Sequence, residues 1–247
     1  MVTGGGGAIG RAIAGQLGAA GVAVAVVAMS AARADATVEA IRAAGGEAAR
    51  FTADLYDPGS IPGLVHGVER LYGEVDILVN NAATVTPLGP VTDLDSAAVL
   101  RALTINVASV VTLAGVVIPA MSRHGWGRIA NICRVVGDPA SWPGGNVYAA
   151  CVAALEAHTV NLAAEVTGTG ITVNALRVQE IGTPVRTWLA GVDPEAIDDP
   201  LIRRFILSQK DIGTVDFDRS AAILLGHLAT TETGRIWSAV VRPTAAG

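Results

Sequence analysis

Short apolar runs rich in valine and isoleucine alternate along the chain with longer stretches whose apolar residues recur at helical spacing. The near-continuous apolarity of runs such as VAVAVVA and VDILVN is typical of strands covered by helices on both faces. Strands are predicted at 22–28, 48–52, 75–80, 127–133, 171–176 and 235–241, with helices between them. We therefore expect an α/β fold with one doubly wound parallel sheet of about seven strands and helices on both faces.

The strand that opens this pattern is short. Only Met1 and Val2 precede a glycine-rich loop, whereas a buried strand usually has about five residues. Two explanations stay open: the chain begins inside this strand, or the strand is unusually weak.

The composition fits a single domain over residues 1–247, with 51% hydrophobic and 16% charged residues and no linker or internal repeat. The longest uncharged apolar stretch, around 107–121, is shorter than the roughly 18 residues of a membrane span. The N-terminal MVTGGGG has neither the basic nor the apolar region of a signal peptide. Because the net charge of −5 is spread without runs of like charge, neither nucleic acid nor a membrane is expected as a partner. We expect a cytoplasmic protein.

Gly5, Gly7 and Gly10 match the pattern G-x-G-x-x-G ahead of a helix-compatible stretch. Glycines let the backbone turn tightly and approach a pyrophosphate, which then lies at the positive end of the helix. Within a run of four glycines, the match also fits a strand-to-helix turn that binds no ligand.

Further motifs follow in order: TGGGGAIG at 3–10, Asp54 in FTADLYD, NNAA at 80–83, Asn106, and Tyr148 in VYAACVAAL. Together they resemble the single-domain short-chain dehydrogenases/reductases (the SDR family), which have a Rossmann-like fold. The resemblance covers essentially the whole chain. Of the family motif T-G-x-x-x-G-x-G, this chain keeps the threonine and two glycines, and Ala8 stands at the middle glycine.

The resemblance implies a nicotinamide cofactor, NAD or NADP, with loss of binding as the alternative. The implied cofactor contacts are Thr3, Gly4, Gly7, Ile9, Gly10, Asp54, Asn80, Ala82 and Thr183. The acidic residue that usually binds the ribose at the end of the second strand is replaced by Ala28. Arg33 either faces a 2′-phosphate, which favours NADP, or is an exposed residue at the start of a helix. Asp54 and Asn80 also have structural interpretations, as a turn acid and a cap.

In the family, a tyrosine protonates the nascent alkoxide, and a lysine four residues later lowers the tyrosine pKa from the same helix face. Tyr148 stands at the acid position, but Val152 stands at the lysine position, and Lys210 is the only lysine in the chain. Arg134, in NICRVVG, replaces the serine that bonds the substrate carbonyl. Asn106 keeps the fourth residue type, and without a lysine to support we expect it to close a helix kink.

The segment that covers the nicotinamide in the family also differs here. NALRVQ places Val178 and Gln179 where the family has Pro-Gly, whereas Thr183 matches the threonine that would contact the carboxamide. The variable segment at about 183–213 is expected to form an apolar substrate lid or part of an interface. Ser141 is interpreted as an ordinary loop serine.

No metal site is predicted, because the four histidines are widely spaced with no carboxylate or cysteine at metal-ligand intervals. Cys133 and Cys151 are interpreted as packing residues in a reducing compartment.

The favoured hypothesis is a catalytically impaired subunit that supports an active homologous SDR partner in a dimer or tetramer. Lysine and serine are lost together while the core pattern is intact, and apolar helices over 97–123 and 147–166 would form the interface. Heteromeric relatives suggest hydroxyacyl- or ketoacyl-CoA substrates. One alternative is an NAD(P)-dependent oxidoreductase or a non-redox enzyme in which Arg134 lowers the pKa of Tyr148. A ligand-binding sensor, self-association, and an ordinary reductase with catalytic groups elsewhere also stay open.

Overall fold

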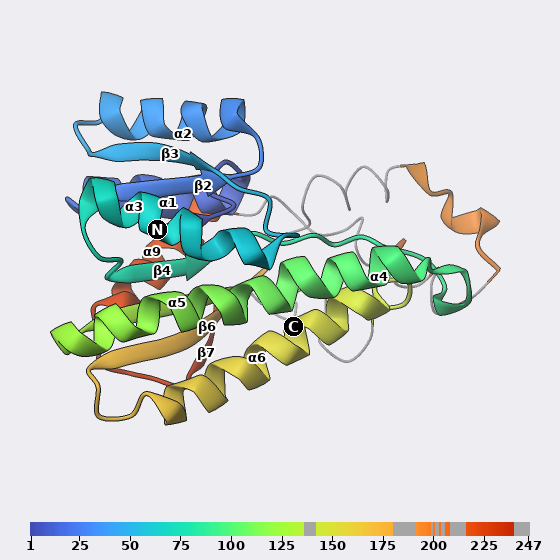
Figure 1. Ribbon diagram of the computed structural model, residues 1–247. Helices are drawn as coiled ribbons and strands as arrows, with labels where there is room; N and C mark the ends of the chain where they lie inside the picture. Colours follow the sequence, from blue (N-terminus) through green and yellow to red (C-terminus); the bar gives the residue numbers. More distant parts are fainter. Residues whose placement is uncertain are drawn as a thin grey trace, which may run out of the picture.

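The computed structural model describes residues 1–135, 142–179, 191–198, 200, 203, 206–207 and 216–239. Its centre is a seven-stranded parallel sheet in the order β3-β2-β1-β4-β5-β6-β7 (Figure 1). The strands are β1 (Val2–Thr3), β2 (Val24–Ala28), β3 (Ala48–Thr52), β4 (Ile77–Asn80), β5 (Gly127–Val135), β6 (Ile171–Gln179) and β7 (Ile236–Ser238). The predicted doubly wound parallel sheet is confirmed.

The strands lie where the apolar runs predict them, with differences at their ends. β5 and β6 run further than predicted because they pair with each other over their whole lengths, from Gly127 opposite Ile171 to Val135 opposite Gln179. β7 is shorter than predicted and pairs only with residues 175–177 of β6. The long β5–β6 pairing carries Arg134 to the carboxyl edge of the sheet, where ligands bind in open α/β folds.

Helices cover both faces of the sheet (Figure 1). The helices are α1 (Ala8–Ala19), α2 (Ala31–Ala43), α3 (Ile61–Tyr72), α4 (Ser96–Leu103), α5 (Ser109–His124), α6 (Asn146–Glu165) and α9 (Phe217–Leu228), with 3₁₀ turns at Pro58–Ser60, Val91–Asp93 and Pro194–Ala196. One apolar core joins α3, α5 and α6 to the sheet, and a second joins α1, α2 and α9 to it. The two cores account for strands that are apolar on both faces.

The two long helices predicted at 97–123 and 147–166 are present. The first is interrupted by a π-helical segment, Thr104–Ala108, which connects α4 to α5 without breaking the rod. In Figure 1 this rod runs beside α6, and α4 also contacts α6. The interruption contains Asn106, near which the sequence predicts a kink.

The stretches Ser96–His124 and Asn146–Glu165 are long and apolar enough to cross a membrane by length and composition. Both stretches are longer than the apolar run at 107–121 that the sequence analysis compared with a membrane span. Both stretches pack against the sheet, with Leu113 and Leu155 among their buried side chains. Helices in the core of a globular domain pass the same length test, so it gives only weak support for a membrane span.

Candidate functional site

The glycine loop connects β1 to α1 at the carboxyl edge of the sheet. Gly4 has a φ of +62°, a left-handed conformation that glycine adopts without strain. A Cβ on Gly10 would collide with the carbonyl oxygen of Gly4, so the helix lies directly against the loop. Gly7 is the N-cap of α1 and supplies no side-chain cap, and both Gly7 and Ala8 are exposed. This open helix N-terminus suits a pyrophosphate group.

Asn81 holds this loop in place, a role that the sequence reasoning missed. Its Nδ2 donates to the carbonyl oxygens of Thr3 (2.9 Å) and Gly4 (3.1 Å), and its backbone N–H donates to Thr3 Oγ1 (2.9 Å). From the other side, Thr37 of α2 donates to the carbonyl oxygen of Gly5 (3.0 Å). The second asparagine of NNAA is the sequence signal for this brace, but only the fold shows which loop it reaches.

Thr3, a predicted cofactor contact, is almost fully buried. Its hydroxyl accepts from the N–H groups of Asn81 (2.9 Å) and Ala82 (3.0 Å) and donates to the carbonyl oxygen of Val79 (3.3 Å). These bonds fasten β1 to the end of β4. In the described structure the hydroxyl therefore acts inside the fold, and its contact with a cofactor stays a prediction.

Asn80 also lies inside the fold. Its Nδ2 donates to Asn131 Oδ1 (2.9 Å), and Asn131 Nδ2 donates to Thr159 Oγ1 (2.9 Å). This chain of buried polar groups connects β4, β5 and α6, so it sets the position of the helix that carries Tyr148. The contact of Asn80 with a cofactor stays a prediction, and the described side chain bonds Asn131 within the fold.

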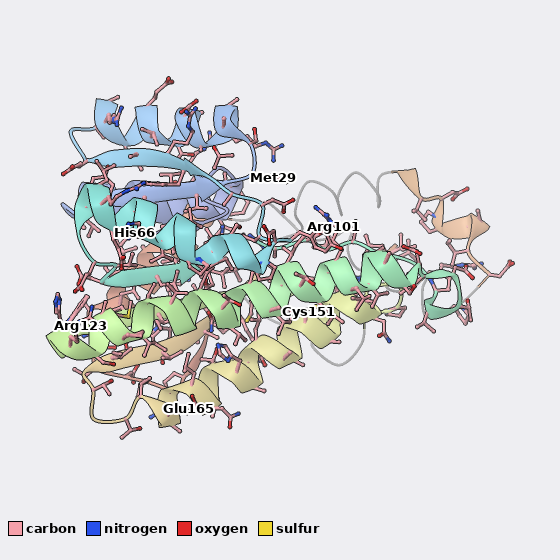
Figure 2. All side chains as sticks on the ribbon, in the orientation of Figure 1. Met29, His66, Arg101, Arg123, Cys151 and Glu165 are labelled. Carbon is pink, nitrogen blue, oxygen red and sulfur yellow. The ribbon has the colours of Figure 1, made fainter. Side chains whose placement is uncertain are left out.

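The end of β2, where the ribose of a dinucleotide would lie, has Ala28 and no carboxylate. Ser30 follows as the N-cap of α2 and accepts from the N–H of Arg33 at 3.5 Å. The Arg33 Cβ lies 2.8 Å from the position that a Cβ on Gly6 would take, so the backbone and Cβ of this exposed residue lie directly beside the glycine loop. Figure 2 shows Met29, with 70% of its surface exposed, at this same edge.

Asp54 follows β3 at the carboxyl edge. Its Oδ1 accepts from the N–H of Tyr56 (3.0 Å), which makes it a turn acid, and its Oδ2 lies 3.7 Å from Arg101 Nη2. The Arg101 guanidinium also stacks 4.3 Å above the ring of Tyr56. The exposed Asp54 carboxylate therefore already has partners within the chain, and its contact with adenosine stays a prediction.

Tyr148 lies near the start of α6 and is 4% exposed. The ring of Trp142 packs edge-to-face against it, with 5.4 Å between ring centroids. One turn further, Val152 packs against an apolar cluster that includes Cys133 and Leu155. The position at which the family has an ammonium group is therefore apolar here.

Asn106 lies in the π-helical segment, but its described hydrogen bonds differ from the expectation that it closes a helix kink. Its side chain does not bond within its own helix: Nδ2 donates to the carbonyl oxygen of Thr84 (2.7 Å), and Oδ1 accepts from the N–H of Thr84 (2.8 Å). Asn106 therefore anchors the loop after β4 to the helix rod. This pairing joins residues 22 positions apart, which local spacing could not reveal.

Arg134 reaches back from β5 to the end of β4. Its Nη2 donates to the backbone oxygen (2.9 Å) and to Oδ1 (2.8 Å) of Asn81. Because Asn81 also bonds the glycine loop, Arg134, Asn81 and Gly4 form one connected network. The residue at the family's serine position thus supports the cofactor loop.

Cys133 and Cys151 are both buried, and burial changes the pKa of their thiols. It raises the pKa of Cys133 to about 12, and burial also raises the pKa of Cys151, although a hydrogen bond with Asn106 opposes the second shift. Both side chains are protonated at neutral pH, which fits packing better than nucleophilic catalysis. Among the residues that the structure describes, no group of three His, Cys, Asp or Glu side chains is placed to hold a metal ion.

Several predicted positions fall outside the described residues. They are Ser141, Thr183, Lys210 and most of the segment 183–213. Val178 is buried in the second core, and Ile9 is buried at the start of α1.

The chain is similar in sequence to one reductase and two dehydrogenases. The chain is 32% identical to the 3-oxoacyl-[acyl-carrier-protein] reductase FabG of Pseudomonas aeruginosa over 98% of this chain and 93% of that protein. It is 31% identical to the 2-(R)-hydroxypropyl-CoM dehydrogenase of Xanthobacter autotrophicus over 75% of this chain and 73% of that protein. It is 28% identical to the cis-4-hydroxycyclohexanecarboxylate dehydrogenase of Sinomonas cyclohexanicum over 98% and 92%.

Solved structures give the same picture. NAD⁺-bound xylitol dehydrogenase matches with a TM-score of 0.84 and 26% identity, over 96% of this chain and 95% of that chain. A metagenomic short-chain oxidoreductase in complex with NADP matches with a TM-score of 0.77 and 25% identity, over 98% and 96%. The sequence profile of the short chain dehydrogenase family matches residues 1–190. With the sheet order, the glycine loop and the placement of Tyr148, these likenesses show that the chain belongs to the short-chain dehydrogenase family.

Proposed function

We propose that this chain is a catalytically impaired member of its family that supports an active homologous subunit in the cytoplasm. The observation that carries the proposal is the apolar packing of Val152, one helical turn after Tyr148. A phenol has an ordinary pKa near 10, so it needs a neighbouring cation to exchange protons efficiently near neutral pH. Valine cannot supply that charge.

In the sequence analysis, Arg134 is considered as the cation that replaces the missing lysine near Tyr148. Its described hydrogen bonds run to Asn81, where two bonds from one nitrogen hold the guanidinium at the cofactor loop. An arginine also keeps its proton at ordinary pH and cannot replace lysine in a proton relay. The hydrogen bonds from Arg134 to Asn81 therefore support a maintained scaffold.

The residues present fit a dinucleotide. The open N-terminus of α1 would hold its pyrophosphate, and Arg33 would bond a 2′-phosphate, so we propose NADP as the preferred cofactor. When bound, that cofactor would supply a hydride to a carbonyl carbon or accept one from an alcohol. In the proposed complex, the bound cofactor stabilises this subunit and the partner performs the turnover.

The partner surface is formed by the outer faces of the rod and of α6. Leu100, Val111 and Val160 are exposed there, by 62%, 45% and 46%. The exposed positions of α6 also include alanines 149, 150, 153 and 157, which would let another helix approach closely. Adjacent apolar side chains on two long helices fit an equally apolar helix pair, which a homologous subunit presents.

The relatives suggest the substrate class of the partner. One reduces 3-oxoacyl groups on acyl carrier protein, and another is named for a hydroxypropyl thioether of coenzyme M. We propose that the complex acts on hydroxyacyl or ketoacyl groups carried on sulfur.

The test is capture from the native host with the tagged chain, followed by assay of the captured material. We expect a second short-chain dehydrogenase in stoichiometric amount and NADPH-dependent reduction of a 3-oxoacyl thioester by the complex but not by the tagged chain alone. The variant Val160→Asp should lose the partner, whereas Leu71→Asp, at an exposed position of α3 outside that surface, should keep it. Turnover by the isolated chain that Tyr148→Phe abolishes would contradict the proposal and support an enzyme using Tyr148.

A further inference from the structure

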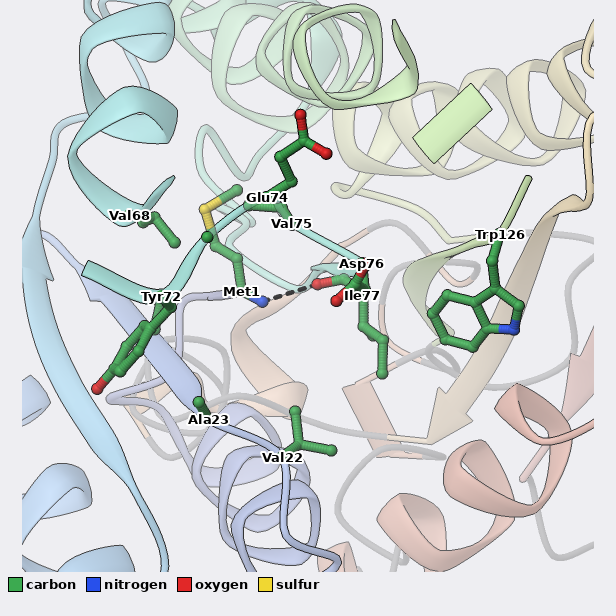
Figure 3. A pocket seen from close by; sticks show the side chains of 12 residues that line it. Met1, Val22, Ala23, Val68, Tyr72, Glu74, Val75, Asp76, Ile77 and Trp126 are labelled. Atoms are coloured by element: carbon green, nitrogen blue, oxygen red, sulfur yellow. Dashed lines mark hydrogen bonds between the residues drawn. The ribbon is translucent and has the colours of Figure 1, made fainter. Parts of the chain in front are cut away.

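The chain has three methionines and two cysteines, and one of these five sulfur-containing side chains is open to solvent. Met29 is 70% exposed, whereas Met1, Met121, Cys133 and Cys151 are each 7% exposed or less. Met1 lies at the opposite edge of the sheet, where it lines a cavity and its side chain packs into the first apolar core (Figure 3). A dissolved oxidant therefore has its most direct access to the thioether of Met29.

The two thiols are protected by their chemistry as well as by their position. Burial raises the pKa of Cys133 to about 12 and also raises the pKa of Cys151. Both thiols stay protonated near neutral pH, and they react slowly with peroxides because the thiolate is the reactive form. A thioether has no proton to lose, so its oxidation depends on exposure. At Met29, neither burial nor protonation prevents oxidation.

Met29 directly follows β2 at the carboxyl edge of the sheet. On one side of this strand end, the Gly5 N–H of the glycine loop donates to the Val27 carbonyl oxygen at 3.0 Å. On the other side, the Ala53 N–H of the loop after β3 donates to the Ala28 carbonyl oxygen at 3.3 Å. In a doubly wound fold, the ribose of a dinucleotide lies at this end of the second strand. The exposed thioether therefore starts from the backbone position nearest to the expected adenosine half of the cofactor.

The backbone on both sides of Met29 is held by hydrogen bonds. The strand before it pairs with β1 and β3, and Ser30 after it is the N-cap of α2, with its carbonyl oxygen accepting from the Ala34 N–H at 3.2 Å. The residue is thus fixed in place while most of its side-chain surface stays open. A nucleotide bound at this edge would cover part of that surface, because methionine packs readily against ring systems.

We propose that Met29 is an oxidation-sensitive residue of the cofactor site, and that its conversion to methionine sulfoxide weakens the binding of NADPH. Hydrogen peroxide is the oxidant: its O–O bond breaks, one oxygen atom is bonded to the Met29 sulfur, and the other leaves as water. The sulfur is oxidised by two electrons and the peroxide is reduced by two. The product is a polar side chain with a hydrogen-bond acceptor where an apolar one packed before, so the nucleotide loses an apolar contact.

This inference rests on the cofactor binding in the proposed function and adds a means of regulating it. Met29 lies outside the partner surface, which is formed by the rod and α6, so a bound subunit would leave it accessible. A bound cofactor would instead shield it. The cofactor-free form of the chain is therefore the form that an oxidant modifies.

The test begins with purified full-length chain treated with hydrogen peroxide, with and without saturating NADP⁺. Peptide mass spectrometry follows the gain of one oxygen atom at each methionine. We expect Met29 to be modified before Met1 and Met121, and NADP⁺ to slow the modification of Met29. After removal of peroxide and nucleotide, fluorescence titration should give a Kd for NADPH about 10-fold higher for the oxidised chain than for the untreated chain.

Two variants assign the effect to one sulfur atom. Met29→Leu keeps an apolar side chain that peroxide cannot oxidise, so its Kd for NADPH should be the same before and after treatment. Met121→Leu removes a buried methionine, and it should lose affinity on treatment as the parent chain does. A loss of affinity in treated Met29→Leu as large as that of the parent chain would overturn the inference, because the damage would then lie elsewhere.

The remaining outcomes separate this inference from the proposed function. Tight NADPH binding that is unchanged after complete oxidation of Met29 would overturn the inference and leave the proposed cofactor in place. Oxidation of Met29 at the same rate with and without bound NADP⁺ would also overturn it, because the cofactor would not cover the thioether. An untreated chain that binds no NADPH would overturn both.

Discussion

Arg134 donates two hydrogen bonds to Asn81, and Asn81 in turn donates one to Thr3 at the end of β1 and one to Gly4 in the glycine loop. In this way the residue at the family's serine position is connected through one side chain to the loop that would bind a pyrophosphate. A substitution of Arg134 would therefore also affect the support of the glycine loop.

The first prediction concerns this brace. Asn81→Asp keeps the acceptor for Arg134 but replaces the Nδ2 donor with an oxygen facing two carbonyl groups. We expect a loss of about 1–3 kcal/mol in the free energy of unfolding, because buried acceptors lose their donor. Urea unfolding would measure it. Asn161→Ala is the control, since its amide bonds an exposed carbonyl of its own helix, and equal stability of Asn81→Asp and the parent chain would show that the brace contributes nothing.

The second prediction restores the missing chemistry. The double variant Arg134→Ser with Val152→Lys should acquire NADPH-dependent reduction of a 3-oxoacyl thioester that the parent chain lacks, because an ammonium one turn from Tyr148 lowers the pKa of the phenol. Stability should fall by about 1–3 kcal/mol, since the lysine enters an apolar cluster and Asn81 loses a partner. Turnover measured beside Arg134→Ser with Val152→Met, which adds length without charge, isolates the effect of the ammonium. A parent chain as active as the double variant would refute catalytic impairment.

The third prediction concerns cofactor choice. Arg33 stands beside Gly6, so Arg33→Ala should weaken NADPH binding about 10-fold or more and leave NADH binding unchanged, because only NADPH has the 2′-phosphate that a guanidinium bonds. Fluorescence titration with each nucleotide gives both Kd values. Arg50→Ala is a suitable control, because Arg50 pairs with Asp35 on the surface. A proportional loss for both nucleotides would place Arg33 away from the 2′-phosphate.

The fourth prediction is a pH dependence. Burial raises the pKa of Cys133 from about 9 to about 12, so the folded protein keeps a proton that the unfolded chain releases between these values. The free energy of unfolding should therefore decrease as pH rises from about 9 towards 12. Cys133→Ala should show a shallower decrease in chemical unfolding measured at several pH values. Identical slopes for the two proteins would show that the thiol titrates normally in the fold.

Much of the fold is determined by the sequence itself. Apolar runs of strand length between helical stretches predict the sheet, because strands covered on both faces must be apolar throughout. The glycine loop and the two long helices follow from equally local patterns. The replacement of lysine by Val152 is likewise visible without a structure, since it depends only on a four-residue spacing.

The tertiary structure decided what each polar side chain does. Asn81 reaches residues 77 and 78 positions away, Arg134 reaches back 53 positions, and Asn80 bonds into the core. Only the order of the strands brings these partners together, because the hydrogen bonds depend on which strand lies beside which and in what register.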